Sequence, residues 1–187
     1  MTNVHSAKMF TGFGIELTPL TLNDIEQVRQ WRNHPDITKY MVDQSYINTE
    51  QQQQWFHLLS NRDDQQYLMI SYKQQHIGVI YGKSLTSEPL LIAETIELGL
   101  YLDPESKYRN SILAFSPSLV FIHYLFHCCQ CRKLLAHVLP HNQSAIRYNT
   151  QLGYEITGTD ESGMVIMELN QANFDQAKMK LAKILRF

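Results

Sequence analysis

Residues 117–129, with the sequence PSLVFIHYLFHCC, restrict the possible folds of this chain more than any other segment. Nearly every position is apolar, so a helix formed here has no face suited to water. Such a helix must be buried, with a sheet on one side and other elements on the other. The segment therefore predicts a layered α/β protein.

β-rich segments on both sides of this helix supply the sheet. The stretch 66–85 contains two β-rich runs separated by a polar turn at 73–76, which indicates a hairpin. The remaining elements are expected as strands at 14–20, 94–102, 133–139, 154–159 and 163–169, and helices at 22–33, 50–61, 143–152 and 170–187. This order predicts a mixed sheet with helices on its faces.

The first expected helix, residues 22–33, shows an amphipathic pattern. Thr21 stands where a helix cap is favoured, and Leu22, Ile25, Val28 and Trp31 recur on one helical face. The segment therefore predicts an amphipathic helix.

Charge and hydropathy exclude several classes of protein. The formal net charge is -2 and no segment is strongly basic, so we expect no nucleic-acid partner. No apolar run approaches the roughly 18 to 20 residues that span a bilayer, and the first residues show no signal-peptide pattern. We expect a cytoplasmic single domain over 1–187, flexible over 1–12, with a C-terminal helix over 170–187.

Three cysteines, at positions 128, 129 and 131, form the sequence CCQC. No second Cys/His cluster stands at a spacing that would complete a metal site, and an odd count does not suit a disulfide framework. We therefore expect free, buried thiols and no metal.

A loop without glycine connects the strand at 94–102 to the buried helix. Its sequence, DPESKYRNSILAFSPSL, runs from Asp103 to Leu119. Backbone N–H groups and the helix dipole readily hold a phosphate at such a position, and most loops of this kind use glycine for close approach. The loop is either a phosphate site built from unusual residues or the remnant of one.

The segments IELGLYLDPESKYRNSILAFSPSLVFIHYLF and RKLLAHVLPHNQSAIRYNTQLGYE resemble the core of the GNAT acetyltransferases. With WRNHPDITKYM near the start, the chain looks most like the branch of ribosomal-protein N-terminal acetyltransferases and the amino-sugar N-acetyltransferases of pseudaminic acid synthesis. The resemblance covers roughly Ile15 to Leu169. It implies the GNAT fold, a central mixed, mostly antiparallel twisted sheet flanked by helices, and acetyl transfer from acetyl-coenzyme A to a primary amine.

The resemblance places the cofactor loop at Arg109, the first position of the family pattern Q/R-x-x-G-x-G/A. Ile112 stands where the first glycine is usual, and Ala114 satisfies the last position. Ile112 can still offer its N–H if φ stays negative and its side chain points away. By resemblance, contacts to acetyl-coenzyme A come from Leu98, Leu100, Tyr101, Leu102, Arg109, Asn110, Ser111, Ile112, Leu113, Ala114, Asn142 and Asn149. An inactive GNAT-like domain is the alternative.

Glu97 is the residue that the resemblance implies as general base, with Glu94 as a weaker candidate. A structural glutamate in a cross-strand ion pair is the alternative for Glu97. The family usually binds the oxyanion through a backbone N–H near Leu98 to Leu100, where Gly99 suggests a bulge.

The family's tyrosine, which protonates the departing thiolate, falls on Asn149. Tyr148 lies one residue earlier, about 100° around the helix, and is the available candidate acid. Asn142 has two readings, a helix cap and a contact to the pantetheine arm.

Trp31, Arg32 and Asn33 border the acceptor pocket by resemblance; a core Trp with a surface Arg is the alternative. The expected acceptor is a small-molecule amine, possibly on a UDP-linked amino sugar, and the enzyme is expected as a monomer or homodimer. Two rivals stay open, a protein N-terminal acetyltransferase and a non-catalytic acyl-coenzyme A or ligand-binding domain.

Overall fold

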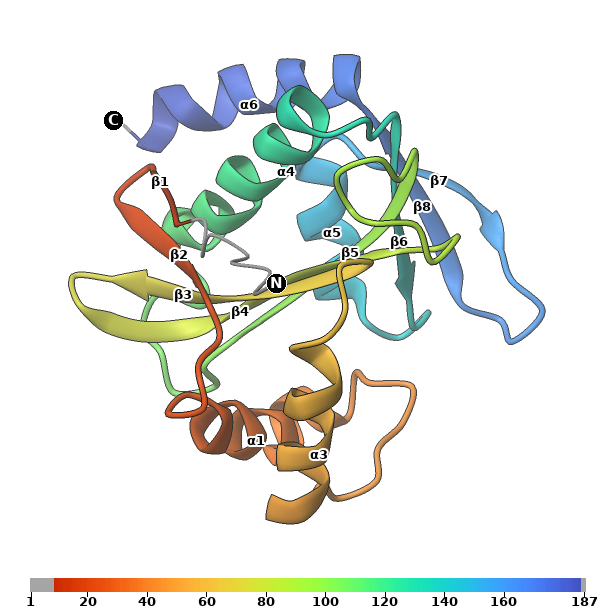
Figure 1. Ribbon diagram of the computed structural model, residues 1–187. Helices are drawn as coiled ribbons and strands as arrows, with labels where there is room; N and C mark the ends of the chain where they lie inside the picture. Colours follow the sequence, from red (N-terminus) through yellow and green to blue (C-terminus); the bar gives the residue numbers. More distant parts are fainter. Residues whose placement is uncertain (1–8, 186–187) are drawn as a thin grey trace, which may run out of the picture.

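The structure, a computed structural model that describes residues 9–185, contains one eight-stranded sheet with helices on both faces (Figure 1). Along the chain the elements are β1 (Phe10–Gly12), β2 (Ile15–Pro19), α1 (Ile25–Asn33), α2 (Pro35–Thr38), α3 (Thr49–Leu59), β3 (Gln65–Tyr72), β4 (Gln75–Ser84), β5 (Thr95–Leu102), the 3-10 helix η1 (Ile112–Phe115), α4 (Ser116–Cys128), β6 (Lys133–Val138), α5 (Gln143–Gln151), β7 (Glu155–Thr159), β8 (Val165–Asn170) and α6 (Gln171–Leu185).

The strand order in the sheet is β1-β2-β3-β4-β5-β6-β8-β7. Every neighbouring pair is antiparallel except β5 and β6, so the expected mixed, mostly antiparallel sheet is confirmed. The predicted hairpin is β3 and β4. Its turn contains Lys73 and Gln74, both with positive φ, which matches the tight hairpin turns that follow strand twist.

Two apolar layers lie on opposite faces of the sheet. Figure 1 shows α4 and α6 on one face and α1 and α3 on the other. The larger core joins α4 to Ile96, Leu98 and Leu102 of β5. A smaller cluster joins Val28 of α1 to Met69 of β3, with Tyr101 of β5 packed against it. Side chains of β5 thus alternate between the two layers, as the two-residue period of a strand requires.

The strands β5 and β6 separate soon after they begin. They pair only over Thr95–Glu97 and Lys133–Leu135. Beyond that point β5 pairs only with β4, and β6 pairs only with β8. The sheet therefore opens on the carboxyl side of Glu97, and the loop into α4 starts at the far end of the same strand.

Three expectations about local structure are wrong. The first helix begins at Ile25, because Thr21 donates from both its N and its Oγ1 to the Asp24 carboxylate in a preceding turn. Leu22 in that turn is 66% exposed. Residues 10–12 of the supposedly flexible N-terminus form β1, while residues 1–8 lie outside the described part.

Gly99 does not form the expected bulge. The register between β4 and β5 is continuous from Gly78 with Leu102 to Ser84 with Ile96. The missing side chain instead leaves space for the ring of Tyr81 from the neighbouring strand.

Candidate active site

A cavity of about 730 Å³ lies on the face of the sheet covered by α1 and α3. Its walls come from α1, the segment 40–47, α3 and the loop that follows β7. Its floor is formed by side chains of β5 and β6, and side chains of β3 and β4 complete its walls. Because Glu97 and Tyr101 of β5 both reach it, the cavity adjoins the place where β5 leaves β6.

Glu97 and His137 meet on this floor. Nδ1 of His137 lies 2.9 Å from Oε1 of Glu97, and the two side chains are 25% and 29% exposed, respectively. Glu97 thus lies in the cavity, and its partner there is an imidazole. Sequence reasoning missed His137, although it shares one face of β6 with Lys133 and Leu135 by strand alternation.

Aromatic rings form one wall of the cavity. Tyr67 and Tyr81 are stacked with centroids 4.8 Å apart, and Trp55 of α3 meets Tyr67 edge-on at 5.0 Å. Burial raises the pKa of Tyr81 to about 12, and it raises the pKa values of Tyr67 and Tyr101 still further above the ordinary value. All three hydroxyls therefore stay protonated near neutral pH and can serve as hydrogen-bond donors.

Two cations face this aromatic wall. Lys83 lies opposite Glu97 in the β4–β5 register, with Nζ 5.1 Å from the ring centre of Tyr81. Arg32 of α1 donates from Nη2 to the backbone oxygen of Asp43 at 2.6 Å. Its Nη1 is buried and has no hydrogen-bond partner in the described chain. A buried, unpaired guanidinium nitrogen beside a cavity is suited to an anionic group of a ligand.

Of the three residues expected at the acceptor pocket, only Arg32 lines the cavity. Trp31 is a core residue, 6% exposed, in the cluster under α1. Asn33 lies outside the lining and holds the segment 40–47 in place, because its amide exchanges two hydrogen bonds, 2.8 and 2.9 Å long, with the backbone of Ile47.

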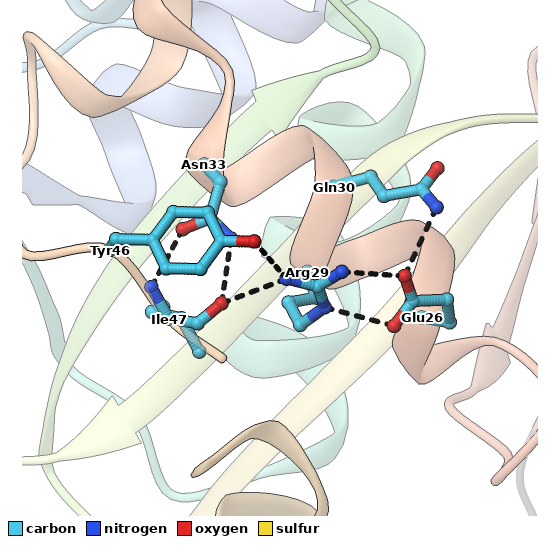
Figure 2. A network of polar contacts seen from close by, with 6 residues as sticks. All are labelled: Glu26, Arg29, Gln30, Asn33, Tyr46 and Ile47. Atoms are coloured by element: carbon cyan, nitrogen blue, oxygen red, sulfur yellow. Dashed lines mark hydrogen bonds and ion pairs between the residues drawn. The ribbon is translucent and has the colours of Figure 1, made fainter. Parts of the chain in front are cut away.

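Arg29 reinforces the same attachment (Figure 2). Its Nη1 donates to the Ile47 carbonyl at 2.9 Å and to the Tyr46 hydroxyl at 3.0 Å. Its other nitrogens bind both carboxylate oxygens of Glu26, and Gln30 donates to the same carboxylate. These bonds, with the one from Arg29 foremost, lower the pKa of Glu26 to about 2. The network fixes the cavity rim formed by Tyr46 and Ile47 onto α1.

The glycine-free loop keeps the features that a phosphate site requires. Ile112 has negative φ, and its side chain is 36% exposed. The N–H groups of Asn110, Ile112 and Leu113 donate no hydrogen bond to residues 9–185, whereas the N–H of Ser111 is taken by the Tyr108 carbonyl at 3.1 Å. Three N–H groups in the segment just before α4 are thus available to an anion at a helix start. The residues present therefore fit a pyrophosphate.

Arg109 belongs to this loop, and its side chain contacts α2. Its Nη1 is 3.4 Å from Oδ2 of Asp36 and 3.5 Å from the Pro104 carbonyl. These contacts are long, so the guanidinium can exchange them for a phosphate. Ala114, the other small position of the loop, is buried at 6% exposure.

The remaining predicted residues contribute through the backbone or hold helices. The side chains of Leu98, Leu100 and Leu102 belong to the core under α4, which leaves only their main-chain groups for a ligand in the β5–β6 opening. Asn142 is confirmed as a cap, because its Oδ1 accepts from the N–H of Ala145 at 3.1 Å. Asn149 donates to Sδ of Met167 at 3.7 Å.

Tyr148 connects α5 to the start of α4. Its hydroxyl donates to the Ala114 carbonyl at 2.9 Å and lies 2.8 Å from Oγ of Ser118. Its ring stacks on Phe115 at 4.6 Å. Burial raises the pKa of this hydroxyl well above its usual value. The Tyr148 side chain therefore attaches the end of the glycine-free loop, at Ala114 and Phe115, to α5.

The opened sheet, the N–H groups before α4 and the adjoining cavity together define an acyltransferase that holds a phosphate-bearing acyl donor. Residues 15–155 match the acetyltransferase (GNAT) domain family, and the chain belongs to this family. It is an acetyl-coenzyme A-dependent N-acetyltransferase.

Comparisons with individual proteins agree with this assignment. Acetyltransferase PseH of Campylobacter jejuni subsp. jejuni serotype O:23/36 is 29% identical over 144 residues, which cover 77% of this chain and 85% of that protein. The crystal structure of Campylobacter jejuni N-acetyltransferase PseH has a TM-score of 0.63 at 23% identity, covering 84% and 99% of the two chains. The structure of AAC(6')-Ib with paromomycin and acetyl-coenzyme A has a TM-score of 0.75 at 17% identity, covering 87% and 97%.

Two further results concern the described residues. Among them, no group of three or more His, Cys, Asp or Glu side chains is placed to hold a metal ion. None of their helices is both long and apolar enough to cross a bilayer. None of the three cysteines forms a disulfide with a described residue, but only Cys131 is buried, so the expectation of buried thiols is wrong for exposed Cys128.

Proposed function

We propose that this enzyme acetylates a primary amine on a nucleotide-linked sugar, by direct attack of the amine on acetyl-coenzyme A. The observation that carries the proposal is Arg32, whose buried Nη1 has no hydrogen-bond partner among residues 9–185 and lies beside a cavity lined by Tyr67, Tyr81 and Trp55. Aromatic faces suit sugar and base rings, and an unpaired guanidinium suits a phosphate. The sequence resemblance to amino-sugar N-acetyltransferases and the PseH relatives support the same class.

The chain's own groups supply the conditions for transfer. Acetyl-coenzyme A, when bound, provides the thioester whose carbonyl carbon is attacked. The N–H groups of Asn110, Ile112 and Leu113 would hold its pyrophosphate, and main-chain groups in the opening beyond Glu97 would align its arm. The pair of Glu97 and His137 at the cavity floor provides the proton acceptor that a protonated amine requires.

Two cations, Arg32 and Lys83, line the cavity and can bind an anionic group of the acceptor. The lining also contains the carboxylates of Asp43, Glu97 and Asp160, which suit the amine end of the same molecule. An acceptor that carries both a phosphate and an amine matches this mixture of charges. A cytoplasmic location and a monomer or homodimer stay predictions.

Thiol release tests this proposal with a panel of amines. We expect the UDP-linked amino sugar to give a kcat/KM at least tenfold above the free amino sugar, kanamycin and a basic N-terminal peptide. Arg32→Gln should remove most of the preference for the UDP-linked form over the free sugar. Equal rates for the two sugars, or a preference for the peptide, would contradict the acceptor class while leaving acetyl transfer intact.

A further inference from the structure

The contact between Glu97 and His137 indicates a different role for each of the two side chains. Glu97 is the last residue of β5 that pairs with β6, and its partner there is Leu135. His137 lies two residues after Leu135 on the same face of β6, and its ring contacts the Glu97 carboxylate. Both side chains line the cavity and remain partly exposed. Substrate and solvent can therefore reach the pair.

The hydrogen bond fixes the tautomer of the imidazole. An ionised carboxylate only accepts hydrogen bonds, so Nδ1 of His137 must carry the hydrogen that Oε1 of Glu97 receives. A neutral imidazole has one N–H group, which leaves the lone pair on Nε2. Within residues 9–185, Nε2 has no hydrogen-bond partner. The ring thus presents one free basic nitrogen.

We propose that Nε2 of His137 is the atom that takes the proton from the bound ammonium group, and that Glu97 is a positioning residue that orients the imidazole. The assignment rests on the proposed acetylation of a primary amine. It differs from the sequence-based expectation, in which Glu97 itself is the base.

The proton and electron pairs balance as follows. One N–H bond of the ammonium breaks, its proton goes to Nε2, and the electron pair stays on nitrogen. That pair forms the new C–N bond at the thioester carbonyl, and the C–S bond breaks with its pair on sulfur. The second proton lost by nitrogen neutralises the thiolate through water, and His137 returns its proton to solvent.

An imidazole suits this step better than a carboxylate. Proton transfer is most efficient when donor and acceptor have similar proton affinities. In model compounds an α-amino group has a pKa near 8, a glutamate carboxyl near 4.3 and an imidazole near 6.5. The difference in pKa between such a donor and its acceptor is therefore about 3.7 for a carboxylate and about 1.5 for an imidazole.

Other charged or titratable groups face the pair and bear on its pH dependence. They are Arg32 of α1, Tyr40, Asp43 and Tyr46 of the segment 40–47, Tyr67 of β3, Tyr81 and Lys83 of β4, Tyr101 of β5, Asp160 after β7, and Glu168 of β8, which forms an ion pair with Lys133 of β6. Burial raises the pKa values of Tyr67, Tyr81 and Tyr101, and that of Tyr81 is about 12. Hydrogen bonds from Ser45 lower the pKa of Asp43. Hydrogen bonds from Ser162, and then from Met164, lower the pKa of Asp160. A titration near neutral pH is thus not expected from Tyr67, Tyr81, Tyr101, Asp43 or Asp160.

The experiment measures kcat against pH, from 5 to 9, for wild type, His137→Gln and Glu97→Gln, with whichever amine the wild type acetylates. His57→Gln is the matched control, because His57 of α3 is exposed and lies outside the cavity lining. Circular dichroism and coenzyme A affinity verify that each variant folds. His137→Ala is assayed with added imidazole as well.

We expect His137→Gln to lower kcat at pH 7 by about 10² to 10⁴-fold. The variant should also lose the rise of kcat with pH between 5 and 8. Glu97→Gln should keep this pH dependence with a lower kcat, because the imidazole remains but loses the carboxylate that orients it. Imidazole should restore part of the activity of His137→Ala and none of that of Glu97→Gln.

The proposal is overturned if Glu97→Gln removes the rise of kcat with pH while His137→Gln retains it. It is also overturned if His137→Gln keeps more than a third of the wild-type kcat. A wild type that acetylates no amine in the panel contradicts the proposed function instead, so the two failures are distinguishable.

Discussion

The hydroxyl end of Tyr81 occupies the space in which a side chain on Gly99 would stand. The two residues face each other in the β4–β5 register, and a Cβ on Gly99 would overlap the Tyr81 ring. The position of this ring also sets the aromatic wall of the cavity, since Tyr81 stacks on Tyr67.

Gly99→Ala should therefore displace Tyr81. We expect the free energy of unfolding to fall by about 1 to 3 kcal/mol, the usual result of overpacking, and the KM for the amine to rise. Chemical denaturation and steady-state kinetics measure the two effects. Gly158→Ala is the control, because a Cβ there meets nothing within 4 Å. Equal stability of the two variants would show that Tyr81 moves without cost.

Arg109→Ala should weaken coenzyme A binding. Arg109 belongs to the loop before α4 and makes only long contacts to Asp36, and a charge-assisted hydrogen bond to phosphate contributes about 1.5 to 3 kcal/mol. Calorimetry should show the Kd rising by roughly 10 to 150-fold. Arg132→Ala removes the same charge at an exposed site just before β6 and should change the Kd less than twofold. Similar effects from both variants would point to general electrostatics.

Tyr148→Phe should affect stability more than chemistry. The buried hydroxyl donates to the Ala114 carbonyl, and its loss should cost about 1 to 2 kcal/mol of unfolding free energy. We expect turnover to fall less than tenfold, equivalent to about 1 kcal/mol in the barrier. A loss of a hundredfold or more with coenzyme A binding intact would identify Tyr148 as the acid that protonates the thiolate.

Glu26→Gln should reveal a pH-dependent contribution to stability. The pKa of Glu26 is lowered from 4.5 to about 2, so the bonds from Arg29 stabilise the fold above about pH 4.5. That contribution is lost as pH falls toward 2. Wild type should unfold at a higher temperature than the variant at pH 7, and the difference should shrink between about pH 4.5 and 2. The pair is exposed on the Glu26 side, so added salt should reduce the effect.

Glu161→Gln is the matched control for this prediction. Glu161 is exposed in the turn between β7 and β8 and makes no ion pair with another described residue. A stability difference of the same size and pH dependence in this variant would mean that the Arg29 network does not hold the rim of the cavity.

Most of the fold could be predicted because hydrophobic periodicity is local. The alternation in 66–85 and the apolar run in α4 identify the hairpin and the buried helix from neighbouring residues alone. The start of α1 could not be located in this way. A turn closed by Thr21 and Asp24 has the same residue types as a helix cap, and only the three-dimensional hydrogen bonds distinguish them.

The site was less accessible to sequence reasoning because it depends on register. Glu97 was identified from its place before the cofactor loop, but its contact with His137 follows from the pairing of Glu97 with Leu135 across a parallel ladder. No pattern within either strand encodes that alignment. Likewise, neighbouring residues on α1 diverge: Trp31 points into the core and Arg32 into the cavity, because consecutive positions are about 100° apart around a helix.

The short ladder between β5 and β6 is the place where two parts of the sheet join. Strands β1 to β5 and strands β6 to β8 are connected in the sheet through the pairing of Thr95–Glu97 with Lys133–Leu135. Glu97 belongs to the first part and His137 to the second, so their 2.9 Å contact adds a side-chain bond to this short run of backbone pairing. The contact that orients the imidazole for the proposed proton transfer therefore also joins the two parts of the sheet.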